Sequence, residues 1–297
     1  MLHLAIECSA LAGSVAILQQ QTLITERQLP PNIGSVVSLA PTIAELLAQY
    51  CSGSSAQVEL ISVTHGPGSF TGLRAGLATA KMLGLAWKIP LVTVDTLQVI
   101  AARSAQVVVK NFCEAGEELG AEANQPVVVA VLNAFRKQVF AAAWCVSTDG
   151  PQPKLAPEGL GLTLKPLATT QVLDAPLWQA QPLSSLENCA RDLRPPSSLP
   201  PCSPPALPPN SHPSALEQNS QEPRRIWISG PGLRTYTPQS DSRVNLIDQS
   251  AWDPVAGWVG RLGWQNYLAG QAVSAAELCP NYVRRSAAEE ARSAAET

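Results

Sequence analysis

One stretch of the sequence, from Ile61 to Ile89, reads ISVTHGPGSFTGLRAGLATAKMLGLAWKI. It joins a short apolar run to a long helical pattern through the corner Gly66-Pro67-Gly68. Such a corner is a strong loop signal, because glycine accepts positive φ and proline fixes one turn dihedral. A strand, a glycine-rich corner and a helix in this order often hold a phosphate or a partner at the helix N-terminus.

The predicted helix carries a stripe of small residues. Gly72, Gly76, Ala80 and Gly84 recur at every fourth position and therefore share one helical face. A glycine inside a helix costs roughly 0.5–1 kcal/mol relative to alanine, so three of them need compensation. Two explanations are open: the stripe receives the backbone of a partner, or it packs against this chain's own sheet.

Composition narrows the function classes. The chain has 297 residues, enough for two domains, and its net charge of −3 disfavours a free-standing nucleic-acid binder. Basic pairs such as Arg136-Lys137 are expected to lie on the solvent-exposed surface. They could also contact RNA inside a larger assembly. Widely spaced cysteines, histidines without metal-ligand spacing and the lack of a long apolar run predict a cytoplasmic protein without a metal or membrane span.

Strands and helices alternate along the chain. Strands are predicted over Leu2–Glu7, Ser14–Leu18, Thr22–Gln28 and Leu91–Val94. A helix is predicted from Ser35 to Tyr50, and another begins at the Asp95 cap and runs through Arg103. The helix that starts at Asp253-Pro254 runs to about Ala269.

Two features of the N-terminal part recur later. A second hairpin is predicted over Val127–Leu132 and Val139–Val146, and Ile226–Gly232 again ends an apolar strand in Gly-Pro-Gly. These echoes suggest an internal duplication with mixed strands and helices, an α/β architecture. We expect an N-terminal lobe at 1–104, a C-terminal lobe at 105–194 and 224–285, a disordered Pro/Ser-rich insertion at 195–223 and a polar tail at 286–297.

The motif HGPGSFTGLRAGLATAK at 65–81 resembles the signature of the TsaB (YeaZ-like) family. The similarity extends over the first hairpin, the helix around Pro41, the second hairpin and Pro280-Asn281-Tyr282-Val283-Arg284. It departs where the family's usual aspartates are replaced by Glu7 and Asn133. The resemblance implies a two-lobed actin-like ATPase fold with duplicated mixed-sheet domains.

The resemblance also implies a function. Proteins of this family are non-catalytic scaffolds that pair with TsaD and are joined by the ATPase TsaE. The complex transfers threonylcarbamoyl to N6 of the adenosine next to the tRNA anticodon. For this chain it implies no catalytic residue, tRNA contact only through the complex, and pairing through the two helices of the first lobe. The expected partner interface is Val36, Leu39, Ile43, Leu47, Gly72, Leu73, Gly76, Ala80 and Gly84.

Two other readings remain open. The chain could be an enzyme itself, either an actin-like ATPase or kinase, or a peptidase that uses Ser69 and His65. For neither kind of enzyme does the sequence show the supporting acids that the chemistry needs. Alternatively, the loops bind ATP or ADP loosely at the partner interface, without chemistry. The candidates for that contact are Ser9, Gly66, Gly68 and Ser69. An exposed stripe would also permit a homodimer when the chain is alone.

Overall fold

The structure, a computed structural model, describes residues 1–11, 13–30, 33–50, 58–117, 119, 125–148, 162–180, 225–239, 242 and 244–283. The predicted insertion at 195–223 and the predicted tail at 286–297 lie outside these residues. In the part of the chain that is described, no helix is long and apolar enough to cross a membrane.

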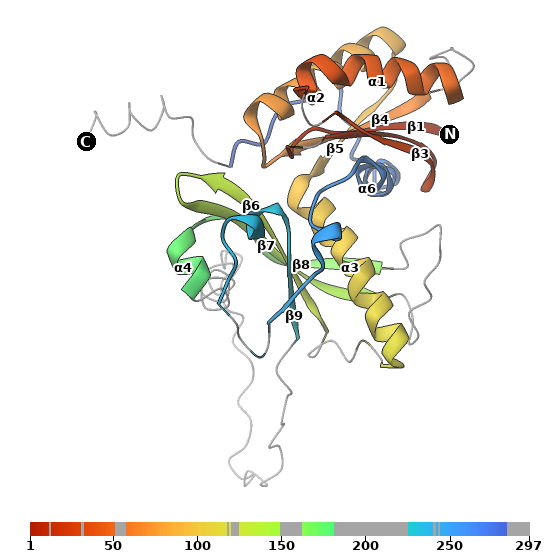
Figure 1. The fold of residues 1–297 in the computed structure, drawn as a ribbon. Coiled ribbons are helices and arrows are strands. Elements are labelled where there is room, and N and C mark those ends of the chain that lie inside the picture. The colour runs from red at the N-terminus through yellow and green to blue at the C-terminus, as the bar shows by residue number, and fades with distance from the viewer. Residues whose placement is uncertain are drawn as a thin grey trace, which may run out of the picture.

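The first sheet forms the upper lobe in Figure 1. Its strands are β1 (Leu2–Glu7), β2 (Ser14–Gln19), β3 (Thr22–Gln28), β4 (Val58–Gly66) and β5 (Leu91–Asp95), in the order β3-β2-β1-β4-β5. The first three strands pair antiparallel, and β4 and β5 join in parallel. Two helices, α1 (Ser35–Tyr50) and α2 (Phe70–Trp87), lie side by side over the side of this sheet that points away from the second lobe.

The second sheet repeats this topology. Its strands are β6 (Val127–Phe135), β7 (Gln138–Thr148), β8 (Leu162–Asp174), β9 (Ile226–Ser229) and β10 (Val244–Leu246), in the order β10-β9-β6-β7-β8. When the second sheet is followed from β8 to β10, its strand order and its antiparallel and parallel pairings match those of the first sheet from β3 to β5. The duplicated α/β fold predicted from the two echoes is therefore confirmed.

The short helices of the second lobe flank its strands. They are α4 (Ala175–Ala180) after β8, η3 (Pro231–Arg234) after β9 and η4 (Gln249–Ala251) after β10. The residue before each proline of the two Gly-Pro-Gly corners has nearly the same backbone, with φ of 124° at Gly66 and 126° at Gly230. These left-handed values favour glycine at both places.

In each half of the fold, the inner face of the sheet packs against a helix that follows the last strand of the other half. The helix α3 (Thr96–Ala115) follows β5, but Ile100, Val108 and neighbouring residues pack with the second sheet. The helix α6 (Ala256–Leu268) follows β10, but Val259 and Leu262 pack against the first sheet (Figure 1). The sequence placed 224–285 in the C-terminal lobe, and α6 departs from that division because its apolar face fits the inner face of β1 and β2.

Two helical predictions differ from the structure in detail. The helix that begins at Asp95 does not end near Arg103 but continues to Ala115, where Gly116 closes it with a φ of 67°. Its interior from Ser104 onward is buried under the second sheet, so packing between lobes stabilises a segment with a weak local pattern. The last helix, predicted to start at Asp253-Pro254, begins at Ala256 instead. The predicted helix from Ser35 to Tyr50 is confirmed as α1, which continues through Pro41.

Candidate functional site

The corner between β4 and α2 packs directly on the turn of the first hairpin. The backbone N–H of Ser69 donates to the carbonyl of Ser9 at 2.7 Å, and the Ser69 hydroxyl caps α2 by accepting from the N–H of Gly72 at 3.3 Å. A side chain at Gly68 would overlap the Ser9 backbone. The glycines of the corner therefore allow two loops to touch, and the serine starts the helix.

The four residues predicted to contact a nucleotide are brought together here, but they mainly bind one another. Ser9 is buried, its N–H donates to Glu7 Oε1 at 2.6 Å, and its hydroxyl donates to the same oxygen. The amide of Ser69 is taken by Ser9. A nucleotide at Ser9, Gly66, Gly68 and Ser69 stays a prediction, and most of its donors would have to come from a partner.

Glu7 is the last residue of β1, the central strand of the first sheet. Its side chain is fully buried, and this burial raises its pKa to about 7, with the charge of Asp253 adding to the rise. Its Oε2 has no hydrogen-bond partner among the described residues. These residues also contain no group of three His, Cys, Asp or Glu side chains that could hold a metal. A lone buried carboxyl of this kind does not fit a metal ligand.

The peptidase reading finds little support in this geometry. The Ser69 hydroxyl is the cap of α2, and none of the described hydrogen bonds joins it to His65. Burial lowers the pKa of His65, and its carbonyl accepts from the N–H of Asn281 at 2.7 Å. His65 thus fastens the C-terminal segment to the corner through its backbone.

The C-terminal segment that follows α6 returns to the corner. It pairs with β5 between Val273 and Leu91 and ends beside α2. There the Nε of Arg74 donates to the Tyr282 hydroxyl at 3.0 Å, and the rings of Phe70 and Tyr282 stack at 5.4 Å between centroids. The Arg74 guanidinium lies 3.7 Å from the centroid of the Phe70 ring. The sequence motif around Tyr282 marked the segment, but no pattern in it shows which residues it contacts.

The small-residue stripe of α2 faces this chain's own sheet. A Cβ at Gly76 would lie 3.2 Å from the Cβ of Cys8, and one at Gly84 would lie 2.7 Å from Leu91. The role predicted for the stripe as a partner surface is therefore corrected, because the sheet already occupies the space that the glycines leave. The predicted interface residues that are buried are Leu39, Ile43, Leu47, Gly72, Leu73, Gly76, Ala80 and Gly84.

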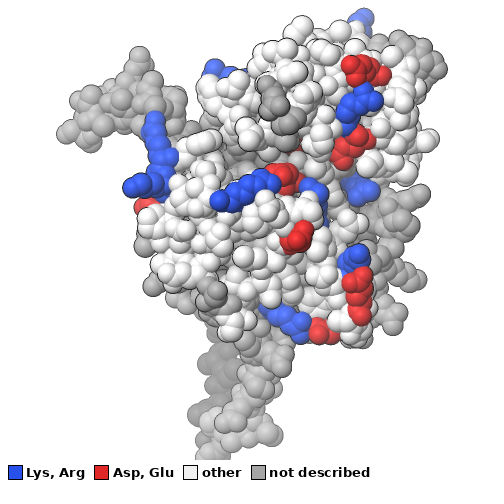
Figure 2. Space-filling view, in the orientation of Figure 1, with Lys and Arg blue, Asp and Glu red and all other residues white. Residues whose placement is uncertain are grey.

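The opposite faces of the two helices are exposed and largely apolar. Of the predicted interface residues only Val36 lies there, 63% exposed. Met82 and Leu85 of α2 are 70% and 63% exposed. We call this surface the outer face; it consists of Val36, Val37, Ala40, Ala44 and Ala48 of α1 and Ala78, Met82, Leu85 and Ala86 of α2. Over these helices Figure 2 is mostly white, with a short row of charged side chains near one end.

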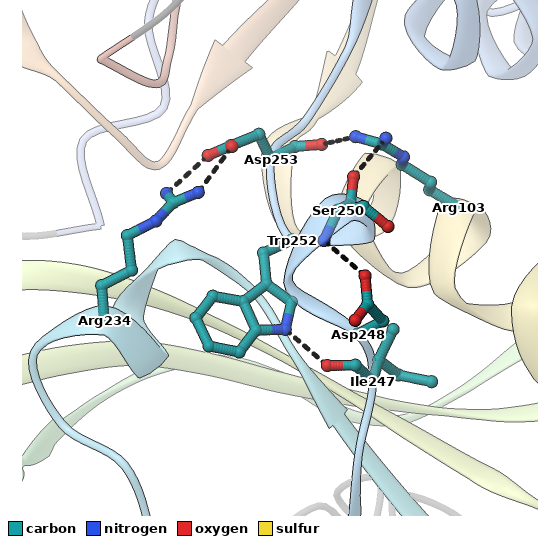
Figure 3. Close-up of polar contacts among 7 residues, drawn as sticks. All are labelled: Arg103, Arg234, Ile247, Asp248, Ser250, Trp252 and Asp253. Atoms are coloured by element: carbon teal, nitrogen blue, oxygen red, sulfur yellow. Dashed lines mark hydrogen bonds and ion pairs between the residues drawn. The ribbon is translucent and has the colours of Figure 1, made fainter.

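A second polar cluster joins the lobes (Figure 3). Arg234, directly after the second Gly-Pro-Gly corner, forms two hydrogen bonds of 2.8 and 2.7 Å with the carboxylate of Asp253. Arg103 of α3 donates to the carbonyls of Asp253 and Ser250, both at 2.6 Å. Asp248 caps η4 at the N–H of Ser250, and the Trp252 indole donates to the Ile247 carbonyl. The cluster therefore fixes the segment that leads into α6.

The start of α6 is capped by strands of the other lobe. The N–H of Ala256 donates to the Ser14 hydroxyl at 2.7 Å, and that of Gly257 donates to Glu26 Oε1 at 3.1 Å. Ser14 itself donates to Glu26 at 3.1 Å. Sequence reasoning missed these caps, because their donors and acceptors lie more than two hundred residues apart.

Comparisons with known proteins give matches over parts of the chain. A family model described as TsaD, tRNA N6-adenosine threonylcarbamoyltransferase, matches residues 34–143. A tRNA threonylcarbamoyladenosine biosynthesis protein TsaB from Bacillus subtilis (strain 168) is 33% identical over 102 residues, which cover 34% of this chain and 44% of that protein. The protein of the same name from Escherichia coli (strain K12) is 32% identical over 99 residues, 33% of this chain and 42% of that protein. The match thus spans less than half the length of either relative.

Two further matches cover more of the chain. An uncharacterized protein of Mycobacterium tuberculosis (strain ATCC 25618 / H37Rv) is 29% identical over 170 residues, 50% of this chain and 80% of that protein. The solved structure of YeaZ from Pseudomonas aeruginosa superposes with a TM-score of 0.57 at 19% identity, covering 95% of this chain and 99% of that chain. At this identity the likeness shows the fold, which agrees with the two matching sheets.

Proposed function

We propose, from the TsaB/YeaZ-like family that these matches support, that the chain takes part in tRNA threonylcarbamoyladenosine biosynthesis as a non-catalytic scaffold. In this proposal it pairs with a TsaD-like catalytic subunit, and a TsaE-like ATPase joins the pair. The names of the relatives support the pathway, and the match to the TsaD family model is consistent with a chain related to its own partner.

The outer face of α1 and α2 is the observation that carries the scaffold role. Exposed alanines at 40, 44 and 48 leave α1 smooth, so the helix of a partner can approach closely. Met82 and Leu85 supply adaptable apolar contacts beside them. A contiguous apolar surface on two adjacent helices is typical of a protein–protein interface. We therefore place the partner on this face, opposite the buried glycine stripe.

Charge insertion tests the interface. The double variant Ala44→Glu/Met82→Glu puts two carboxylates into the outer face, and we expect the affinity for a co-expressed TsaD-like subunit to fall at least about tenfold, since buried unpaired charges are costly. Affinity is measured by calorimetry, and circular dichroism checks the fold. The matched control is Leu268→Glu at the end of α6, where the leucine is 66% exposed and lies on another surface.

The outcomes separate the buried stripe from the outer face. Gly76→Leu would overlap Cys8 and should lower the thermal midpoint of the chain, whereas the outer-face variant should leave it unchanged. Equal partner affinity of the double variant and the wild type would overturn the interface. When the chain is alone, the same face can pair with a second copy, which light scattering over a range of concentrations would detect.

Loose ATP or ADP binding at the partner boundary belongs to the same proposal. The corner amides and hydroxyl of Ser9 and Ser69 are engaged within the chain, so we expect calorimetry with ADP to show heat only when the TsaD-like subunit is present. Heat of equal size with the isolated chain would contradict a site that the partner completes.

A further inference from the structure

The two hairpins of the duplicated fold end differently. In the first, the turn after β1 folds inward, and Ser9 is buried against the Gly-Pro-Gly corner. In the second, β6 and β7 remain paired as far as Phe135 and Gln138, so only Arg136 and Lys137 form the loop. This second tip projects from the edge of its lobe in Figure 1.

The residues at this tip adopt a costly backbone. Phe135, Arg136 and Lys137 have φ values of 59°, 52° and 61°, all in the left-handed region. A two-residue hairpin loop with two positive φ values favours Asn-Gly, whereas this chain places Arg-Lys there. The geometry is held by two backbone contacts, from the N–H of Phe135 to Asn133 Oδ1 at 2.7 Å and from the N–H of Ala175 to the Lys137 carbonyl at 2.8 Å. A locally unfavourable sequence that the surroundings hold in place is a mark of function.

The strained turn presents an exposed aromatic ring next to two cations. The side chain of Phe135 is 67% exposed, and Arg136 and Lys137 are exposed next to it. Figure 2 shows a group of blue side chains at the edge of the second lobe where this hairpin lies in Figure 1. At the base of the tip, Gln138 pairs with Asp174 in the strand register and donates a hydrogen bond from its Nε2 to Asp174 at 3.3 Å.

We propose that the β6–β7 tip, made of Phe135, Arg136 and Lys137, is a contact site for single-stranded RNA. Unpaired bases stack on exposed aromatic rings, and the neighbouring cations meet the phosphates. A purely electrostatic contact would not need the phenylalanine, and a purely apolar protein contact would not need two flanking cations. The choice of RNA rests on the proposed role in tRNA modification, in which the tRNA would be the substrate of the complex.

The test separates the ring from the charges. Labelled unmodified tRNA, its anticodon stem-loop and a fully double-stranded RNA are titrated with the full chain, and fluorescence anisotropy is followed over a range of salt concentrations. Phe135→Ala should weaken stem-loop binding about fivefold to a hundredfold, with an unchanged salt slope. Arg136→Gln/Lys137→Gln should reduce the slope of log affinity against log salt by about 1.4, the value for two phosphate contacts on a single strand.

Matched controls come from the rest of the chain. Leu11→Ala removes an apolar side chain that is 96% exposed at the first hairpin turn, and Lys110→Gln removes an exposed cation of α3. Neither should change RNA affinity. Double-stranded RNA should bind more weakly than the stem-loop, since its bases are not free to stack.

The strain gives a second readout. Arg136→Gly and Arg136→Ala both remove the side chain, but only glycine relieves the left-handed φ. The glycine variant should therefore melt about 2–4 °C above the alanine variant, while both bind RNA equally weakly. Equal melting temperatures would overturn the assignment of strain at this turn.

Several outcomes would overturn the RNA contact. They are wild-type chain that does not bind the stem-loop, tip variants that bind it like the wild type, or tip variants that lose binding only to an acidic peptide probe. The last result would assign the tip to a protein partner. Because the tip lies on the second lobe and the outer face on the first, loss of TsaD-like pairing in the outer-face variant reports on the proposed function independently.

Discussion

Glu7 is a carboxyl held in the interior of the first lobe at the end of its central strand. Its Oε1 accepts both the N–H and the hydroxyl of Ser9, but burial outweighs these bonds and raises its pKa to about 7. The unfolded chain has the ordinary value of 4.5. Between these two values the unfolded state has released the proton while the folded state still retains it.

The sign of the pH dependence follows. Below pH 4.5 Glu7 is protonated in both states, and as pH rises toward 7 the unfolded state gains from ionisation, so the fold loses stability. The loss is on the order of 3 kcal/mol and is complete above pH 7. Glu7→Gln should remove this loss, which urea unfolding at acidic and mildly alkaline pH would measure. Burial also raises the pKa of Asp95 to about 6, so a smaller dependence should remain.

If wild type and Glu7→Gln lost stability equally over this range, Glu7 would not be the titrating group. Adding Asp95→Asn to the Glu7→Gln variant identifies the source of the remaining pH dependence. Asp95 caps α3 by accepting from the N–H of Gln98 at 3.0 Å, a bond that asparagine can keep. The family resemblance of the sequence implies an aspartate at this position, which Glu7 replaces. The sequence showed that difference, but burial of the carboxyl follows only from the tertiary packing.

At the scale of elements, the segment before α6 is held by two arginines that should contribute unequally to stability, Arg103 of α3 and Arg234 of η3. Arg103 donates to two main-chain carbonyls and is part-buried, whereas the Arg234–Asp253 pair is 40% and 36% exposed. We expect Arg103→Ala to lower the free energy of unfolding by about 2 kcal/mol, because it removes two hydrogen bonds from a charged donor that is itself part-buried. Arg234→Ala should cost less than about 1 kcal/mol, because solvent screens its ion pair.

Urea denaturation of both variants measures this order, with Arg27→Ala as the control for an exposed ion pair, that of Arg27 and Glu45. A larger loss for Arg234→Ala than for Arg103→Ala would contradict it. The ion pair also shows what Asp253 does instead of its predicted role. It was predicted as the N-cap of the last helix, but α6 begins at Ala256, and its first amides donate to Ser14 and Glu26.

How much the sequence predicts differs between the sheets and the helix faces. The strand–corner–helix pattern and its echo predicted the two related sheets, because apolar runs and Gly-Pro-Gly corners are local signals. The small-residue stripe could not by itself distinguish a partner from the chain's own sheet, since both need close approach. Only the position of Cys8 and Leu91 beneath Gly76 and Gly84 decides it. The contacts of Arg103, Ser14 and Tyr282 join segments far apart in sequence, for which no local pattern exists.

At the scale of the whole molecule, the exchange of helices couples the two halves. The core of the first sheet is closed by Val259 and Leu262 from near the end of the chain, and the core of the second sheet is closed by α3 from its first part. Neither half buries its inner face without the other. Duplicated halves would unfold independently only if each closed its own core.

We therefore expect one cooperative unfolding transition in spite of two separate sheets. Tryptophan fluorescence reports on both lobes, because the buried tryptophans include Trp144, Trp178 and Trp227 of the second lobe and Trp258 of α6. Far-ultraviolet circular dichroism reports on all helices and strands. The two signals should change at the same urea concentration, because α3 and α6 also pack against each other in one apolar cluster, so loss of either helix destabilises both lobes. Leu262→Ala, which leaves a cavity between α6 and the first sheet, should lower both midpoints together, by about 2–5 kcal/mol in free energy. Two resolved transitions, or a Leu262→Ala shift confined to one probe, would show that the exchanged helices do not couple the lobes.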